Sequence, residues 1–179
     1  MNVTDKKFLI AFFSRKGQNY VCGRIVDLKV GNTEVVANMI QKITGGDIFH
    51  IESVTAYPTD YTETTEVARN ELRAKVRPKL TGQVENMKAY EVIFLGYPNW
   101  WGTMPMPVYT FLESYDFTGK KIVPFCTHEG SGMGHSEKDI AKACSKADVL
   151  EGIAIHGTGA ASAESKVSSW IDGLGISRP

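Results

Sequence analysis

The sequence predicts an α/β protein, built on a mostly parallel β-sheet with helices on both faces. Short apolar runs alternate with amphipathic stretches along the chain. Each apolar run has the length of a strand that is buried on both faces. Parallel strands require crossover connections, and the amphipathic stretches can supply them as helices. A length of 179 residues suits one domain with a substantial core, so we expect a single domain over residues 1–179.

The first half of the chain predicts two strands and two helices. Phe8–Phe13 (FLIAFF) has the continuous apolar character of a buried strand. Apolar residues at helical spacing then predict a helix that has Asn32 as its N-cap and stops at Gly45. Ile48–Ile51 is expected to form a short second strand, and residues 60–76 a second helix.

The second half continues the alternation. Val92–Gly96 (VIFLG) and Lys121–Cys126 (KIVPFC) predict the third and fourth strands, and Ile153–Ile155 belongs to a fifth. A helix is expected near Pro105, after the third strand. The last helix is expected around Val167–Leu174, where apolar residues recur at helical spacing.

Two details of the second half carry predictions of their own. Pro124 lies inside the fourth strand, where proline removes a ladder hydrogen bond. We therefore expect either a bulge there or incomplete pairing on one side of that strand. Ser136 and Asp139 have the spacing of a capping box, which predicts a helix start before the fifth strand.

Composition and charge exclude several classes of function. Twenty basic and twenty acidic residues cancel, so no overall field favours nucleic acid or an anionic membrane. No apolar run approaches the roughly 20 residues needed to cross a bilayer, and FLIAFF is too short for a signal peptide. Three cysteines and four histidines are scattered, which predicts neither a disulfide framework nor a metal site. A cytoplasmic location is expected.

Polar and glycine-rich segments follow three of the predicted strands. Ser14 follows the first strand, and Gly31-Asn32-Thr33 opens the helix after it. Residues 97–103 (YPNWWGT) follow the third strand, and residues 127–134 (THEGSGMG) follow the fourth. In an open doubly wound sheet, ligands bind beyond the carboxyl ends of the strands. We therefore expect these segments to meet along one edge and form a ligand site.

Each segment has a functional and a purely structural interpretation. Amides and hydroxyls at Asn32 and Thr33 suit a phosphate at a helix N-terminus, and they also suit an ordinary helix cap. Of Trp100 and Trp101, one is expected to stack on a flat aromatic ligand and the other to cover the edge of the core. The glycines around Gly132 let the backbone approach a planar ring, although they do not form a dinucleotide fingerprint.

An insertion, Arg15–Val30, separates the first strand from the helix that follows it. Between Tyr20 and Leu28, apolar and polar residues alternate around Gly23, which predicts a small β-hairpin or flap. Such a loop costs little closure entropy, because each doubling of its length adds about 0.6 kcal/mol. We expect its two ends to stay close together, so that the flap stands above the ligand site and shapes access to it.

Taken together, the motifs resemble the flavodoxin-like family of FMN-binding proteins. They are FSR followed by an insertion and VGNTE, then YPNWWGT with Pro105 and Pro107, then CTHEGSG with Gly134. The resemblance covers nearly the whole chain. It implies a three-layer sandwich, a five-stranded parallel sheet in the order 2-1-3-4-5, and FMN as the cofactor. The residues that it assigns to FMN are Ser14, Asn32 and Thr33 around the phosphate, Pro98, Asn99, Trp100, Trp101 and Gly102 on one side of the isoalloxazine ring, and Thr127, His128, Glu129, Gly130, Ser131 and Gly132 on the other.

The resemblance implies a redox protein of one of two kinds. It could be an electron carrier that docks to a redox partner protein, or an FMN-dependent NAD(P)H oxidoreductase that reduces a small acceptor. Flavodoxins are usually strongly acidic, whereas this chain is neutral, which disfavours the pure carrier. No side chain is an obvious proton donor, so no catalytic residue is assigned. A non-enzymatic flavin-binding module is the alternative. A hydrolase is less favoured, because Glu129 stands where GxSxG requires its first glycine.

Overall fold

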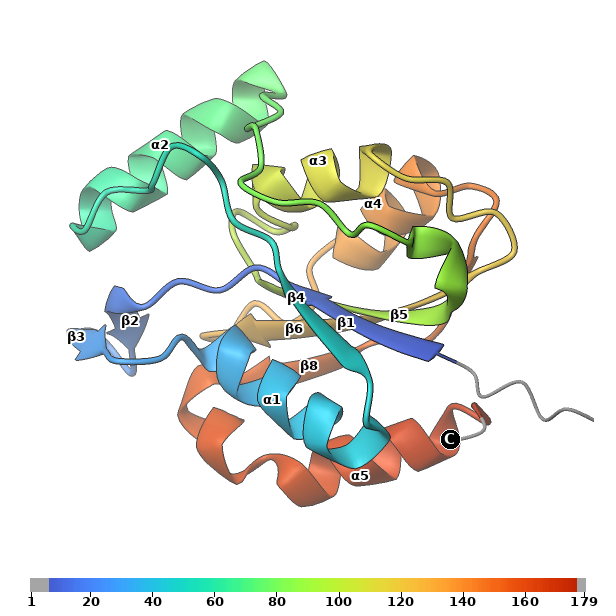
Figure 1. Ribbon diagram of the computed structural model, residues 1–179. Helices are drawn as coiled ribbons and strands as arrows, with labels where there is room; N and C mark the ends of the chain where they lie inside the picture. The colour runs from blue at the N-terminus through green and yellow to red at the C-terminus, as the bar shows by residue number, and fades with distance from the viewer. Residues whose placement is uncertain (1–6, 177–179) are drawn as a thin grey trace, which may run out of the picture.

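The computed structural model describes residues 7–176 and contains one large parallel sheet (Figure 1). β1 pairs with β4 and β5, β5 pairs with β6, and β6 pairs with both β7 and β8, all in parallel. The predicted order of the first four strands is confirmed. The fifth position differs in detail, because two short strands share it. The strands are β1 (Lys7–Phe12), β4 (Asp47–His50), β5 (Tyr90–Pro98), β6 (Lys121–His128), β7 (Asp148–Val149) and β8 (Ile153–His156).

Helices cover both faces of this sheet. One face carries α1 (Asn32–Thr44) and α5 (Glu164–Gly173), and the other carries α3 (Met106–Glu113) and α4 (Ser136–Ala143) (Figure 1). α2 (Tyr61–Ala74) lies at the periphery on the α3 side and contacts α3 and β2. Short 3-10 turns, η1 (Met87–Ala89) and η2 (Gly157–Ser162), complete the fold. Among the described residues, none of the helices has the length and apolar character needed to cross a membrane.

The core consists of two layers, one on each side of the sheet. Successive residues of a strand point to opposite faces, so the apolar run of β1 is divided between the layers. Ile10 joins the layer beneath α1 and α5, whereas Leu9 joins the layer beneath α3 and α4. Continuous burial of this kind explains why the strand is apolar at every position rather than at alternate ones.

Pro124 interrupts the pairing of β6 on one side. Of the two predicted alternatives, a bulge or incomplete pairing, the second is therefore confirmed. On the β5 side, Pro124 stays in register with Leu95. On the other side, β7 pairs with Lys121 and Ile122, and β8 pairs only from Phe125 onward. The missing N–H of proline therefore falls in the gap between β7 and β8. The fifth strand is therefore divided into β7 and β8 at the position of Pro124.

The predicted capping box at the start of α4 is wrong. Ser136 is the first residue of the helix, and its Oγ donates to Met133 O at 2.6 Å and accepts from the Tyr97 hydroxyl at 2.8 Å. Asp139 accepts hydrogen bonds from Thr103 and from other side chains instead of returning to the helix start. Tertiary partners have taken the groups that a capping box would use.

The insertion after β1 forms a separate two-stranded hairpin, as predicted. β2 (Gly17–Val21) and β3 (Arg24–Leu28) pair antiparallel and pair with no other strand of the described chain. Cys22 and Gly23 form the two-residue turn and both have positive φ, 46° and 83°. Such turns suit hairpins, because their twist matches that of the strands. Below, "the hairpin" means residues 17–28.

Candidate functional site

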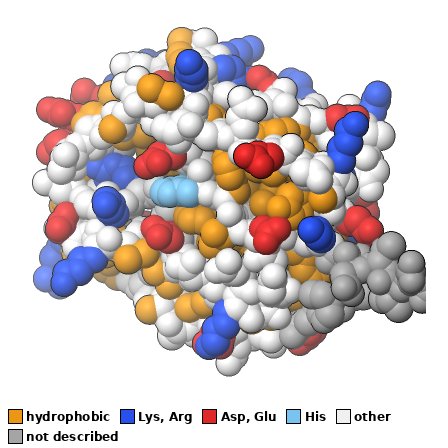
Figure 2. Space-filling view, in the orientation of Figure 1, with side chains coloured by type: hydrophobic (Ala, Val, Ile, Leu, Met, Phe, Trp, Pro, Cys, Tyr) orange, Lys and Arg blue, Asp and Glu red, His pale blue; other side chains and the backbone are white. Residues whose placement is uncertain are grey.

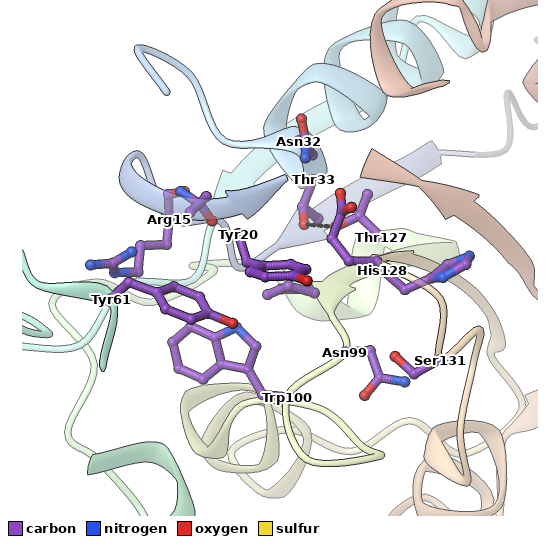
Figure 3. A pocket seen from close by; sticks show the side chains of 13 residues that line it. Arg15, Tyr20, Asn32, Thr33, Tyr61, Asn99, Trp100, Thr127, His128 and Ser131 are labelled. Carbon is purple, nitrogen blue, oxygen red and sulfur yellow. Dashed lines mark hydrogen bonds between the residues drawn. The ribbon is translucent and has the colours of Figure 1, made fainter. Parts of the chain in front are cut away.

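The segments that follow β1, β5 and β6 meet at one edge of the sheet and border a cavity of about 300 Å³ (Figure 3). This edge is formed by the carboxyl ends of the strands, where parallel sheets bind ligands. The hairpin and the first turn of α2 close the cavity from the other side. Below, "the first cavity" means this space. Its lining residues are Arg15, Asn19, Tyr20, Asn32, Thr33, Tyr61, Pro98, Asn99, Trp100, Thr127, His128, Glu129 and Ser131.

The N-terminus of α1 forms one wall of the first cavity. Gly31 is its N-cap, rather than Asn32 as predicted. A side chain at Gly31 would not fit, because a Cβ there would lie 2.2 Å from Ser14 Oγ. Ser14 Oγ accepts a hydrogen bond from the backbone N–H of Glu34 at 3.1 Å. Within residues 7–176, the backbone N–H groups of Asn32 and Thr33 donate no hydrogen bond, so they remain available to a ligand.

A buried hydroxyl pair joins α1 to the end of β6. Thr33 Oγ1 and Thr127 Oγ1 lie 2.7 Å apart, and the two residues are 2% and 4% exposed. One hydroxyl donates to the other, so the pair keeps one hydroxyl hydrogen for an acceptor in the cavity. These donors stand at the positive end of the α1 dipole, which favours an anion.

The two adjacent indoles separate, but the expectation that the second one covers the edge of the core is wrong. Trp100 lines the first cavity and packs edge-on against Phe13 and Tyr57, with ring centroids 5.2 and 5.0 Å away. Trp101 does not line that cavity: it is 50% exposed, and its Nε1 donates to Thr65 O of α2 at 2.9 Å. Trp100 therefore offers a ring that its neighbours hold in place, while Trp101 connects its loop to α2.

Asn99 locks the loop after β5 to the loop after β6. Its backbone N–H donates to Thr127 O at 2.8 Å, and its Nδ2 donates to Gly132 O at 2.9 Å. Its Oδ1 accepts from the backbone N–H of Gly102 at 2.9 Å. Further along, Gly130 N donates to His128 Nδ1 at 2.9 Å. Both loops are therefore fixed by internal hydrogen bonds.

Glu129 is the acidic residue of this rim. Its Oε2 accepts from the backbone N–H of Cys22, at the tip of the hairpin, at 3.3 Å, and lies 3.8 Å from His156 Nε2. Its Oε1 is buried beside Gly157 and has no hydrogen-bond partner among the described residues. Nearby, burial and the neighbouring His156 lower the pKa of His128.

Arg15 fastens the base of the hairpin. Its guanidinium donates to the backbone carbonyl of Gln18 and, at 2.7 Å each, to those of Pro58 and Thr59. Burial lowers the pKa of Arg15, and the nearby Asp60 partly offsets that effect. In the described part of the chain, no carboxylate lies within ion-pairing distance of this guanidinium. The Arg15 charge is therefore not neutralised by an ion pair.

Two tyrosines bring the hairpin and α2 together over the cavity. Tyr20 of β2 and Tyr61 of α2 stack with centroids 6.2 Å apart and an interplanar angle of 28°. Figure 3 places the Tyr20 ring in the middle of the view, between Thr33 and Trp100. Burial and the nearby Tyr20 raise the pKa of Tyr61. The hairpin thus contributes an aromatic side chain to the interior of the site.

Most of the site residues predicted from the sequence border the first cavity. They are Asn32, Thr33, Pro98, Asn99, Trp100, Thr127, His128, Glu129 and Ser131. Ser14 lies behind the α1 N-terminus and lines a different cavity, and Trp101 lines a neighbouring one. Gly102, Gly130 and Gly132 belong to the same loops but do not line the cavity.

The sequence did not single out three lining residues. Asn19 and Tyr20 belong to the insertion, and Tyr61 belongs to α2. Alternation in the insertion indicated a flap but not which of its side chains face the sheet. For Tyr61, the helical stripe of α2 was the available signal. Among the described residues, no group of His, Cys, Asp and Glu is arranged to hold a metal ion.

Comparison with known proteins identifies a family. The model of the flavodoxin family matches residues 26–174. None of the curated proteins matches the chain.

Solved structures resemble the chain over nearly its full length. A candidate flavoprotein from Bacteroides eggerthii is 27% identical, with a TM-score of 0.78, and the match covers 96% of this chain and 99% of that one. A flavoprotein from Lactobacillus acidophilus in complex with FMN is 19% identical, with a TM-score of 0.62, covering 91% and 99%. An NADH:FMN oxidoreductase in its apo form is 11% identical, with a TM-score of 0.55, covering 94% and 88%.

Proposed function

The chain belongs to the flavodoxin family, and from that premise we propose that it is an FMN-binding redox protein that delivers electrons to a small acceptor. FMN is the cofactor that the family supports. The observation that carries the proposal is the meeting of three chain segments, after β1, β5 and β6, around one cavity. A phosphorylated, planar ligand needs such a combination of anion donors at one end and aromatic and backbone surface at the other.

The residues of the cavity fit each part of FMN. The free backbone N–H groups of Asn32 and Thr33, with the spare hydrogen of the Thr33–Thr127 pair, would hold the phosphate. Trp100 and the backbone after β6 would hold the isoalloxazine ring.

When bound, FMN supplies the hydride and electron chemistry, and the chain supplies binding, orientation and exclusion of water. Asn99 fixes both ring-bearing loops, and the hairpin covers the mouth with Tyr20. No side chain of the cavity is assigned to proton transfer.

Reduction of a small acceptor is preferred to docking with a protein partner for two reasons. The chain has no net charge, so it lacks the long-range field that steers a charged redox partner. The hairpin and α2 also stand over the cavity, where a protein partner would have to approach. A small molecule can reach a covered site more easily than a folded protein can.

The test has two stages. Purified protein is first titrated with FMN, and binding is followed by quenching of flavin fluorescence; riboflavin, which lacks the phosphate, is the matched control. Tighter binding of FMN than of riboflavin is expected, and no binding of either would overturn the proposal. The loaded protein is then mixed with NADH or NADPH without oxygen. Bleaching of the flavin absorbance without any other protein supports a reductase. A failure to bleach with both, combined with failure to accept electrons from a chemical reductant, would indicate a non-redox flavin-binding module.

A further inference from the structure

A second cavity of about 420 Å³ lies beside the first. Below, "the second cavity" means this space. The two cavities share five lining residues, so Tyr61 and Trp100 stand at their boundary. A volume of this size is within the range of small-molecule sites. The lining residues are Arg15, Asn19, Tyr61, Thr64, Thr65, Ala68, Asn99, Trp100 and Trp101.

One wall of the second cavity is a whole helical face of α2. Tyr61, Thr64, Thr65 and Ala68 follow the spacing i, i+3, i+4, i+7, which places them on one side of the helix. In a surface helix that side ordinarily packs on the core. Here it faces the cavity. The inward face of α2 is therefore available to a ligand.

The two indoles also line the second cavity, and Trp101 is hydrogen-bonded to α2. Trp101 has φ 57°, a conformation that bulky residues rarely adopt. The bond from its Nε1 to Thr65 O and the contact with Arg69, whose guanidinium carbon lies 5.6 Å from the ring centroid, hold it there. Strained backbone persists only where surrounding contacts over-determine it, and it gathers at ligand sites. Trp100 thus gives the cavity an aromatic surface across from α2, and Trp101 closes the cavity where it contacts that helix.

One cation lines this aromatic space and a second lies behind it. Arg15 lines the second cavity, and no aspartate or glutamate does. Arg69 is not a lining residue: it packs on the Trp101 ring, and its buried Nε has no hydrogen-bond partner among the described residues. Neither arginine forms an ion pair within the described residues. Cations beside flat rings attract a ligand that has both aromatic surface and negative charge.

We propose that the second cavity binds a flat aromatic molecule carrying an oxyanion, such as a ring carboxylate or an ionised hydroxyquinone. The ring lies between α2 and Trp100, and the anion is oriented by Arg15, with Arg69 adding positive charge from behind the Trp101 ring. This site adjoins the first cavity, so its ligand is a candidate for the small acceptor. That role rests on the proposed FMN function, whereas binding itself is measured separately.

The experiment uses the FMN-loaded protein and a matched pair of ligands. A hydroxynaphthoquinone that is ionised at neutral pH is compared with its neutral methyl ether, and both affinities are measured by titration calorimetry. The anion is expected to bind at least about tenfold more tightly than the ether. Equal binding of the two ligands, or no binding of either to protein that holds FMN, would overturn the inference and leave the proposed function standing. Failure of FMN itself to bind overturns the proposed function instead.

Two variants and one control locate the site. Ala68→Leu fills the second cavity from α2, because Ala68 is 7% exposed and lines the second cavity but not the first. It should weaken binding of the anion by about tenfold or more. The control is Val67→Leu, which adds a methylene to the neighbouring residue; Val67 is 36% exposed and lines neither cavity. Its affinities should stay within about twofold of those of the unmodified protein.

Arg69→Gln provides a second test that does not depend on repacking. It should reduce the preference for the anion over the ether and leave the affinity for the ether unchanged. FMN affinity should be unaltered in all three variants. An Ala68→Leu variant that loses FMN and the anion in equal measure would mean that the second cavity is part of the FMN site, which contradicts the inference. An unchanged preference in Arg69→Gln also contradicts it.

Discussion

Replacing Thr33 with valine tests whether the α1 N-terminus holds a phosphate. Valine keeps the shape of threonine and removes its hydroxyl. Thr33 Oγ1 and Thr127 Oγ1 lie 2.7 Å apart in a nearly fully buried setting, so water does not replace the lost partner. The substitution therefore removes one member of the pair and leaves the Thr127 hydroxyl to rearrange. Thr33→Ser is the matched control, because it restores the hydroxyl and removes only a methyl group.

The expected magnitude follows from the type of hydrogen bond. A hydrogen bond to a charged group contributes about 1.5–3 kcal/mol, which corresponds to a roughly 10- to 150-fold weaker affinity for FMN in Thr33→Val. Riboflavin has no phosphate, so its affinity should change by less than about threefold. Without ligand, the lost neutral hydrogen bond should cost about 1 kcal/mol and lower the Tm by about 2–4 °C for a chain of this length.

Flavin fluorescence titrations of the unmodified protein and both variants measure these changes. The decisive quantity is the ratio of FMN affinity to riboflavin affinity. In Thr33→Val this ratio should fall, and in Thr33→Ser it should recover. If Thr33→Val weakens FMN and riboflavin by the same factor, the hydroxyl does not meet the phosphate and the reasoning about the α1 N-terminus is refuted.

Three further perturbations test other parts of the site. Gly157→Ala should weaken FMN binding about tenfold at nearly unchanged Tm. A Cβ at this position would lie 2.1 Å from Glu129 Oε1 and 2.6 Å from Asn32 Nδ2, and both side-chain ends can move to make room. Equal FMN affinity of the variant and the unmodified protein in titrations would contradict this. Tyr97→Phe leaves the fully buried Ser136 hydroxyl without a donor, so thermal unfolding should show a loss of about 1 kcal/mol near pH 7. Burial raises the pKa of Tyr97, so the folded chain keeps this proton longer than the unfolded chain; stability should fall as pH rises above the ordinary value of 10.0, and less steeply in the variant. Deleting the hairpin should leave FMN bound but change the rates at which electron acceptors of different size react, and complete loss of FMN would oppose the proposed role of the hairpin.

The loops of the site could be predicted from the sequence because their polar and aromatic residues come directly after the predicted strands. In a parallel sheet every carboxyl end lies at the same edge, so Thr33, Trp100 and Thr127 could be brought together without knowing any helix position. The hairpin could also be predicted from the sequence, since its alternation of apolar and polar residues and its turn at Gly23 are local properties.

What the sequence could not provide depends on contacts between distant segments. Tyr61 enters the site because α2 stands away from the sheet, and no local pattern records where a helix will dock. Ser136 and Asp139 have a capping pattern, but the Tyr97 and Thr103 hydroxyls bind them instead. In both cases a tertiary partner determines the outcome, which a short-range pattern does not contain.

The face of the molecule in Figure 2 shows acidic and basic side chains mixed around apolar patches (orange). Against that background, the hairpin is tied at two places: Arg15 holds its base to the Pro58–Thr59 carbonyls, and Glu129 holds its tip at Cys22. Release of either tie would free one end of the hairpin above the cavity. Uptake of flavin that depends on this release should saturate at a limiting rate, and a loaded molecule should then exchange its flavin slowly.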